Sequence, residues 1–422
     1  MNRDRLPANL NVFQRLMLQW EQLAPYNAAQ HMAVAGELPQ QRVADAWLAT
    51  VRELGLEAIG QDHDHGALIG HPVGTNFLEA LNLGLNWTIS EDEPPLRPIA
   101  FTHDGRTDLA IVYRHVVADS ASIRLVMRHW FGKLFDDRLC ATAPVQLDTD
   151  TPTLLGMALR SPVRFAREAW REYRRLRRMK TVKRVSPRVD LSAEVCFERR
   201  EMPQGFANLL LAAARKRNAK VNDLFVAAGA MAATEHLPME SSNKRPNVGF
   251  GTIVDTRTRD ASTAFGLSLG FLQTLFAPTE LSDLEAAIQV AALQSEAAKA
   301  RGDSQSSLLR LAGAERWGRH MSDKDLAEFY RKRCPLVGGV SNVNLNRDWA
   351  GEVDRNLLLD YTRISPLGPM LSVVFTPTTL GNQMHMGFTW RRGILNEVSA
   401  DAIARGFLSR LASLVEPGSS PV

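Results

Sequence analysis

His115 and Asp119 are the residues whose types and spacing in this chain best suit acid–base chemistry. They lie four residues apart in RHVVADS, residues 114–120, a polar segment between two apolar ones. A histidine has an unperturbed pKa of about 6.5, so at neutral pH it can take a proton from an attacking hydroxyl or amine. The segment therefore indicates a general base. The plainer alternative is a histidine satisfied at a junction and an aspartate that caps a helix.

A strand and a helix flank this segment and are expected to hold both side chains. DLAIVYR, residues 108–114, is rich in β-branched and aromatic residues, which is typical of a buried strand. After it, apolar residues recur every three or four positions and form one helix face: Ile123, Val126, Met127, Trp130, Phe131 and Leu134. Ser120 or Ser122 is expected to cap this helix. His115 is therefore expected at a strand-to-helix junction, where a rigidly held side chain can border a cleft.

The rest of the chain mixes helical and strand patterns and predicts a mixed α/β fold with two lobes, each a sheet covered by helices. We expect an N-terminal lobe over 1–159, a basic helical linker over 160–189 and a C-terminal lobe over 190–422. The expected helices are 12–21, 40–54, 207–218, 223–237 with Asn222 as its cap, 281–300 and 399–415. The expected strands are 30–37, 108–114, 196–202, 246–259, 337–346 and 369–379.

Length and composition set the class of protein. A chain of 422 residues with 45% apolar and 23% charged residues is typical of a globular protein with more than one core. Cys140, Cys196 and Cys334 are far apart and form no CxxC pair, which predicts neither a disulfide framework nor a cysteine zinc site. We find no apolar run long enough for a membrane span and no apolar segment typical of a secretory signal. The sequence therefore predicts a reduced, cytoplasmic protein.

The segment 160–189 has a strong net positive charge, with twelve basic and two acidic residues, while the remainder of the chain is net negative. Its apolar residues recur at helical spacing and predict an amphipathic helix with a basic face: Val163, Ala166, Trp170, Tyr173 and Leu176. One interpretation is a solvated linker. The others are docking of an acidic carrier protein or of coenzyme A phosphates, and contact with an anionic membrane. Nucleic acid is not expected as a partner, because no binding module is recognisable. The residues expected to dock a carrier or phosphate are Arg171, Arg174, Arg175 and Arg178.

The segment around His115 resembles the HHxxxDG signature of the chloramphenicol-acetyltransferase-like superfamily, which includes the condensation domains of nonribosomal peptide synthesis. Further segments are similar to that superfamily in the expected order: NVFQRLMLQW, KVNDLFVAAGAMAA, TIVDTRTRD and VGGVSNVNLN. The resemblance thus spans most of the chain. It implies two lobes with a channel between them. The DFGWG segment of the plant enzymes is absent, which favours a bacterial stand-alone member that serves secondary-metabolite biosynthesis.

The resemblance implies an acyltransferase. His115 matches the catalytic histidine, which takes a proton from a small-molecule hydroxyl or amine as this attacks a phosphopantetheine thioester. The thioester is a co-substrate on coenzyme A or on an acyl or peptidyl carrier protein, and no permanently bound cofactor or metal is expected. Asp119 matches the signature aspartate and is implied to pair with Arg257, which holds the turn. Ser341 and Asn342 match a late strand and are implied to help bind the developing oxyanion.

Two residues depart from the signature. Arg114 replaces the first histidine, which other branches of the superfamily also lack, and neighbouring residues at a strand end point to opposite faces. Ser120 replaces the final glycine and is expected to add a side chain that lines the channel and narrows it or changes its specificity. A catalytically silent scaffold that binds a carrier protein therefore stays open as an alternative function.

Two other patterns suggest different chemistry. Gly266, Ser268 and Gly270 form a G-x-S-x-G match, followed along the chain by Asp360 and His385 in the order of a serine hydrolase. The nucleophile of such an enzyme needs a helix directly after it, but FLQTLFAP is strand-like. DHDHG, residues 62–66, with nearby His71, offers metal-ligand types. Without a supporting scaffold we interpret it as an exposed loop.

Overall fold

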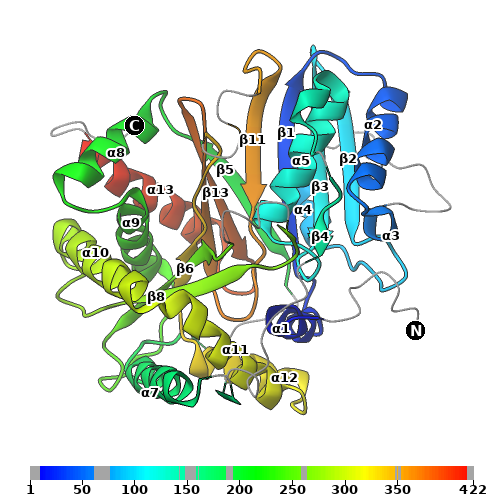
Figure 1. Cartoon of the computed structure of the whole chain (residues 1–422). Helices are drawn as coiled ribbons and strands as arrows, with labels where there is room; N and C mark the ends of the chain where they lie inside the picture. Colours follow the sequence, from blue (N-terminus) through cyan, green and yellow to red (C-terminus); the bar gives the residue numbers. More distant parts are fainter. Residues whose placement is uncertain are drawn as a thin grey trace.

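Two β-sheets covered by helices form the two lobes of the chain (Figure 1). The computed structural model describes residues 10–60, 77–141, 143–147, 158–159, 161–186, 193–257, 264–346, 349 and 353–415. The α/β class expected from the sequence is confirmed. DHDHG and His71 lie outside the described residues.

The first sheet has the strand order β11-β1-β3-β2, and its pairings are antiparallel. Its strands are β1 (Asn27–Ala35), β2 (Leu96–His103), β3 (Arg106–Arg114) and β11 (Leu358–Ile364). Helices α2 (Gln40–Glu53) and α5 (Ser120–Phe135) pack over one face, together with the short α3 (Glu57–Gly60). Helix α4 (Phe77–Leu85) covers the other face. Because both faces are covered, β3 is a continuous buried run rather than an alternating one.

The second sheet is mixed and has the order β5-β13-β12-β9-β6-β8, with β10 paired to β12. Its strands are β5 (Val195–Glu201), β6 (Val248–Asp255), β8 (Leu269–Phe276), β9 (Gly338–Val340), β10 (Val343–Asn344), β12 (Val373–Leu380) and β13 (Gln383–Arg391). Its covering helices are α8 (Phe206–Lys216), α9 (Val221–His236), α10 (Leu284–Arg301) and α13 (Glu397–Val415). Packed phenylalanine rings of α9, α13, β6, β12 and β13 occupy the core between them.

Strand β11 belongs to the first sheet, although the strands before and after it along the chain, β10 and β12, belong to the second sheet. It follows β10 along the chain, yet it pairs with β1 in a register that places Gln30 opposite Arg363. Figure 1 shows β11, in orange, beside the blue β1. A short parallel pair, β4 (Gln146–Leu147) with β7 (Ala264–Phe265), also joins segments distant in sequence. The expected lobes, divided at 159 and 190, do not include a C-terminal strand in the first sheet. Local patterns could not predict it, because β11 pairs with a strand more than 300 residues away.

A layer of helices lies below both sheets in Figure 1. It consists of α1 (Val12–Glu21), α7 (Pro162–Met179), α11 (Asp303–Gly318) and α12 (Asp323–Arg333); the 3₁₀ turn Asp137–Leu139 follows α5. Helix α11 packs against α1, α7 and β8. Helices α11 and α12 were not predicted from the sequence; in α11 the buried apolar side chains include Leu311 and Ala312. Within the described ranges, no helix combines the length and apolarity that crossing a membrane requires.

The two expected helix caps were wrong. Asp119, not Ser120 or Ser122, caps α5, and its carboxylate accepts the Ser122 N–H at 3.0 Å. Asn222 lies inside α9, whose start is closed by the Asp223 carboxylate accepting the Lys220 N–H at 2.9 Å. In both helices an aspartate carboxylate, rather than the expected serine or asparagine side chain, accepts the hydrogen bond that closes the first turn.

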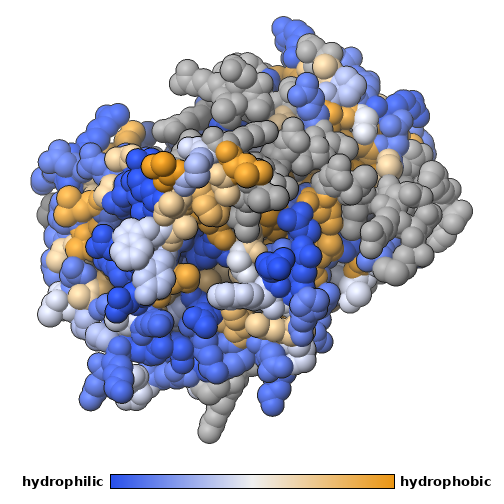
Figure 2. All heavy atoms as spheres, turned by 60° about the horizontal axis from the view of Figure 1, so that its bottom comes forward, coloured by the Kyte–Doolittle hydropathy of each residue, from blue (hydrophilic) through white to orange (hydrophobic). Residues whose placement is uncertain are grey.

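The expected basic helix is present as α7, but most of its expected apolar face is exposed rather than packed inward. Val163, Trp170 and Tyr173 of α7 are 81%, 60% and 50% exposed. The face turned inward is mixed: Met179 is buried, and Glu172 is buried and pairs with Arg175 at 2.7 Å and with Arg310 of α11 at 3.4 Å. Figure 2 brings this side of the molecule forward and shows apolar residues interspersed with strongly hydrophilic ones. Ion pairs to α11 and the apolar packing of Met179 together hold α7 in place.

Candidate active site

A cavity of about 150 Å³ lies between the two lobes. Its walls come from α1, the inner ends of β1 and β11, the turn after β3, β8 and the loop after β9. It is smaller than the roughly 300–1,000 Å³ usual for pockets that enclose a whole ligand, so it fits the reacting ends of substrates. The expected site residues that line it are His115, Ser120, Ser341 and Asn342.

The backbone around His115 fixes which ring nitrogen carries its proton. The His115 N–H extends the sheet ladder by donating to the Tyr26 carbonyl at 3.1 Å. The ring nitrogen Nδ1 lies 2.8 Å from the Ala118 carbonyl oxygen. A carbonyl only accepts, so Nδ1 must donate, and Nε2 of the neutral ring keeps the lone pair. His115 lines the cavity, and Nε2 is the ring nitrogen that keeps the lone pair a general base requires.

Burial lowers the pKa of His115 from its ordinary value of 6.5, and the Ala118 hydrogen bond and the Asp119 charge offset only part of that effect. The ring packs against Tyr26, with centroids 5.6 Å apart, and edge-on against Tyr113 at 5.9 Å. His115 is therefore neutral at physiological pH and ready to accept a proton.

The lowered pKa gives a test of His115 as a general base. A reaction that uses this ring as its base needs the neutral form, so we expect kcat/KM of such a reaction to be constant near neutrality and to fall only as the pH drops through the lowered pKa. The midpoint of this acid limb should lie below 6.5, the ordinary value. A pH profile from about 5 to 8 with one acceptor checks this. A midpoint above 6.5 would show that His115 is not the titrating base, or that it is not buried.

Asp119 points away from His115 and is fully occupied by other partners. Its carboxylate forms a two-pronged pair with Arg257, at 2.7 and 2.9 Å, and accepts the Ser268 N–H at 2.9 Å. Burial opposes ionisation of Asp119, but Arg257 and the backbone hydrogen bonds outweigh it and hold the pKa of Asp119 below its usual range. The expected Asp119–Arg257 pair is present, and it fastens the His115 turn to the segment after β6.

The hydroxyl of Ser120 joins several polar side chains at the cavity wall. It accepts from Arg363 Nε at 2.8 Å, from Gln30 Nε2 at 3.0 Å and from Arg124 Nη1 at 3.2 Å. The cross-strand pairing of Gln30 with Arg363 explains why both reach the same oxygen. The Tyr361 hydroxyl in turn donates to the Gln30 side-chain carbonyl. The serine that departs from the signature glycine therefore organises the cavity wall as well as narrowing it.

The loop after β9 places Ser341 and Asn342 at the cavity, but in different ways. The Ser341 N–H donates to the Phe375 carbonyl at 2.9 Å, so it is not available to an oxyanion. Its carbonyl and hydroxyl accept from Arg363 at 3.2 and 2.9 Å. The Asn342 side chain lines the cavity and carries the N–H groups suited to a developing negative charge.

Arg363 joins the two lobes across the cavity, and its place there was not predicted from the sequence. It is 3% exposed and contacts Ser120 of the first lobe and Ser341 of the second. The signal in the sequence is the pair of charged residues, Asp360 and Arg363, in the otherwise strand-like LLDYTRI, residues 358–364, and it does not indicate where the strand pairs.

Arg114, in the position of the first signature histidine, lies outside the cavity. Its guanidinium pairs with Glu21 at the end of α1, with Nη2 2.6 Å from Oε2. Both side chains are largely buried, at 9% and 13% exposed. Arg114 therefore anchors α1, in agreement with the expectation that it points away from the face of His115.

Ser268 does not have the surroundings of a hydrolase nucleophile. Its N–H donates to Asp119, and the residue after it begins β8 rather than a helix. Gly266 has a φ of +143°, in the region that favours glycine, and its carbonyl accepts the Asp119 N–H at 2.9 Å. The G-x-S-x-G match is thus the loop that receives the signature aspartate.

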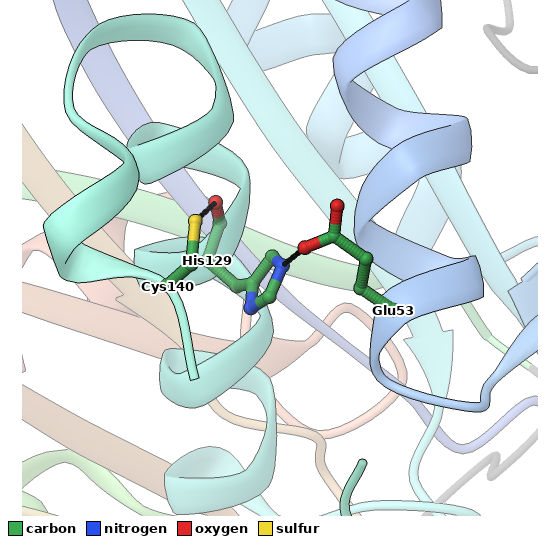
Figure 3. Close-up of side chains that lie close together, drawn as sticks. All are labelled: Glu53, His129 and Cys140. Atoms are coloured by element: carbon green, nitrogen blue, oxygen red, sulfur yellow. Dashed lines mark hydrogen bonds and ion pairs between the residues drawn. The ribbon is translucent and has the colours of Figure 1, made fainter. Parts of the chain in front are cut away.

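Glu53, His129 and Cys140 form a group with metal-ligand types within the part of the chain that the structure describes (Figure 3). His129 Nδ1 accepts the Ala141 N–H at 3.1 Å, so Nε2 carries the proton and donates to Glu53 at 3.0 Å. Lys133 lies 2.8 Å from the same Glu53 carboxylate. Burial raises the pKa of the Cys140 thiol to about 11, which keeps it protonated at neutral pH. The Glu53 carboxylate is thus already bound by His129 and by the ammonium group of Lys133. This arrangement suits a structural cluster.

Removing the Ser120 hydroxyl tests its role in the cavity wall. In Ser120→Ala the donors of Gln30, Arg124 and Arg363 lose their shared acceptor, and an unsatisfied buried donor costs about 1–3 kcal/mol. We expect the free energy of unfolding to fall by about that amount in denaturant titrations. Ser399→Ala, in the first turn of α13, is the matched control and should change stability by less than about 0.5 kcal/mol. Equal effects of the two substitutions would contradict the role assigned to Ser120.

No protein-family model matches the sequence, and no curated protein is similar to it. Solved structures match it over nearly its whole length. The first condensation domain of the calcium-dependent antibiotic synthetase, in complex with a substrate analogue, superposes with a TM-score of 0.70 at 16% identity, covering 97% of each chain. The condensation domain of the monacolin K polyketide synthase superposes with a TM-score of 0.66 at 14% identity, covering 98% of each chain.

An epimerization domain from the third module of a tyrocidine synthetase also matches, with a TM-score of 0.61 at 12% identity, covering 97% of this chain and 96% of that one. At such identities the likeness establishes the fold. The chain has the two-lobed fold of condensation domains, and the resemblance found in the sequence is confirmed at that level. Because domains with different names share this fold, the chemistry must be argued from the site.

Proposed function

We propose that this protein is an acyltransferase that moves an acyl or peptidyl group from a phosphopantetheine thioester to a hydroxyl or amine. The observation that carries the proposal is the arrangement of His115. Its Nδ1 donates to the Ala118 carbonyl, and its ring lines the cavity between the lobes. A neutral imidazole that borders a small cavity and keeps a lone pair is the arrangement required of a general base.

The proposed reaction is a single transfer. His115 Nε2 takes the proton of the acceptor as its oxygen or nitrogen attacks the thioester carbonyl. The new C–O or C–N bond forms, the C–S bond breaks, and the thiol leaves with the proton that His115 returns. Asn342 lines the same cavity, and in this proposal its side-chain N–H groups stabilise the oxyanion. A thioester is already activated, so no acyl-enzyme is needed, and holding both substrates in one cavity supplies much of the rate.

The donor side of this proposal calls for a phosphopantetheine arm, carried by coenzyme A or by a carrier protein, and the acceptor is a small molecule. Acetyl, medium-chain and long-chain thioesters on both carriers, offered with simple alcohols and amines, test it by release of free thiol. Acceptor-dependent release supports the proposal. Binding of a carrier protein with no transfer to any acceptor would instead favour a silent scaffold with this fold.

A further inference from the structure

Helix α7 presents an apolar stripe to solvent. Val163, Trp170 and Tyr173 are 81%, 60% and 50% exposed, and Ala166 is exposed as well. These residues follow one another at spacings of three or four, so they lie along one side of the helix. The rings of Trp170 and Tyr173 stack with their centroids 5.5 Å apart. Leu159, shortly before the helix, is 74% exposed. A continuous apolar stripe of this kind indicates a binding surface.

Arginines lie beside this stripe. Helix α7 carries seven arginines and two glutamates. Glu168 pairs with Arg171 at 3.0 Å, and the buried Glu172 pairs with Arg175 at 2.7 Å. Because both glutamates pair with these two arginines, the solvent-facing side of α7 keeps a net positive charge. Its exposed arginines are Arg167, Arg174, Arg177 and Arg178.

The positive surface continues into a hollow of about 450 Å³ between α7, α10 and the edge strand β8. All four arginines expected to dock a carrier or a phosphate line it: Arg171, Arg174, Arg175 and Arg178. Asp303 in its wall pairs at 2.8 Å both with Arg175 and with Arg301 at the end of α10. Leu293 of α10 also lines the hollow and is 67% exposed. The same surface thus combines apolar side chains with guanidinium groups, whose planar N–H forks match phosphate oxygens.

This combination fits an anionic lipid surface. An amphipathic helix with arginines beside a stripe that contains tryptophan can lie in the plane of a membrane interface. Tryptophan and tyrosine rings are favoured at the level of the lipid headgroups. An arginine can bury its stem among apolar groups while its guanidinium reaches a phosphate. A second copy of the chain would bring the same positive surface, and like charges repel. The charge on α7 therefore favours lipid phosphates over self-association.

We propose that α7 docks this protein on an anionic phospholipid bilayer. The apolar stripe of Val163, Ala166, Trp170 and Tyr173 enters the boundary between headgroups and acyl chains, and the exposed arginines of α7 contact lipid phosphates. Strand β8 lines both the hollow and the cavity of His115, so the docked surface and that cavity share one strand. The docking does not depend on the proposed acyl transfer, and its test needs no turnover.

Sedimentation of the full chain with vesicles tests the docking. The native protein should bind vesicles that mix phosphatidylcholine with phosphatidylglycerol, and should bind phosphatidylcholine alone about tenfold more weakly or less. Added salt should weaken the first of these. Arg174→Ala/Arg178→Ala should lower the partition coefficient for the mixed vesicles about tenfold or more. Trp170→Ala/Tyr173→Ala should lower it by about the same factor but keep its salt dependence, because this variant removes apolar contact and no charge.

The matched controls lie on α8, at the opposite end of the second lobe from α7 (Figure 1). Arg215→Ala/Lys216→Ala removes the same charge from exposed positions, and Leu209→Ala shortens an apolar side chain that is 48% exposed. Both should leave the partition coefficient unchanged. A lipid with a spin label near its headgroup reports the position of α7. It should quench the fluorescence of the native protein more than that of Trp170→Phe, because Trp170 then lies at the interface.

Equal losses in Arg174→Ala/Arg178→Ala and in Arg215→Ala/Lys216→Ala would show that general positive charge attracts the vesicles, and would overturn the proposal. So would native binding by a folded Trp170→Ala/Tyr173→Ala protein, because the stripe would then not touch the bilayer. Absence of binding to the mixed vesicles would overturn it as well. If an acidic carrier protein then binds the native chain but not Arg174→Ala/Arg178→Ala, α7 docks a protein instead of a bilayer.

Discussion

His115→Ala is expected to lower kcat/KM for acyl transfer by a factor of about 10² to 10⁴, the usual contribution of a positioned general base. The reason is the hydrogen bond from Nδ1 to the Ala118 carbonyl, which leaves Nε2 as the acceptor of the substrate proton. His115→Gln should lose a similar factor, because an amide cannot take up the proton. Steady-state thiol release measures both variants.

The matched control for this substitution is His236→Ala, at the exposed end of α9, which should retain the native rate. Both variants should keep a native thermal transition, which separates a loss of chemistry from a loss of folding. A His115→Ala protein that folds normally and transfers acyl groups at the native rate would contradict the mechanism.

Arg257→Ala is expected to lower the free energy of unfolding by about 3–5 kcal/mol, the cost of leaving one charge of a buried pair without its partner. Asp119 is fully buried and Arg257 is 8% exposed, so water cannot replace the lost guanidinium. Denaturant titration measures the effect. The pair joins the turn after β3 to the segment after β6, so the loss should also displace His115 and lower activity.

Two further variants separate this pair from an ordinary ion pair. Arg392→Ala breaks an exposed pair with Glu194, 54% and 62% exposed, and should cost no more than about 1 kcal/mol. Asp119→Ala/Arg257→Ala should cost clearly less than the sum of its single substitutions, because it leaves no unpaired buried charge. If Arg257→Ala is no more destabilising than Arg392→Ala, Asp119 and Arg257 do not fasten the two segments.

The strand, turn and helix around His115 could be predicted because each depends on nearby residues. The apolar run before His115 and the helix face after Ser120 are local signals, and the structure has β3 and α5 in those places. The caps were less predictable, since serine and aspartate compete for the same role within a few residues. The orientation of α7 was missed because ion pairs to α11 contribute to it, and these partners are distant in sequence.

The residues of the candidate site also divide into those that nearby sequence could predict and those that it could not. His115, Asp119, Ser341 and Asn342 belong to segments with a recognisable resemblance, and the expected pairing of Asp119 with Arg257 is present. Arg363 reaches the cavity because β11 pairs with β1, and nothing in its own segment indicates that pairing. The hollow lined by the α7 arginines also requires α7, α10 and β8 to meet, which only the packed structure shows.

The central claim is tested most directly by identifying the acyl product formed by the native protein and by His115→Ala under the same conditions. Mass spectrometry of the acceptor, together with thiol release, should show one acylated acceptor for each thiol released by the native protein. The variant should form almost none. Acylated acceptor formed equally by both proteins, or thiol released without any acylated acceptor, would contradict the assignment of His115 as the base of an acyltransferase.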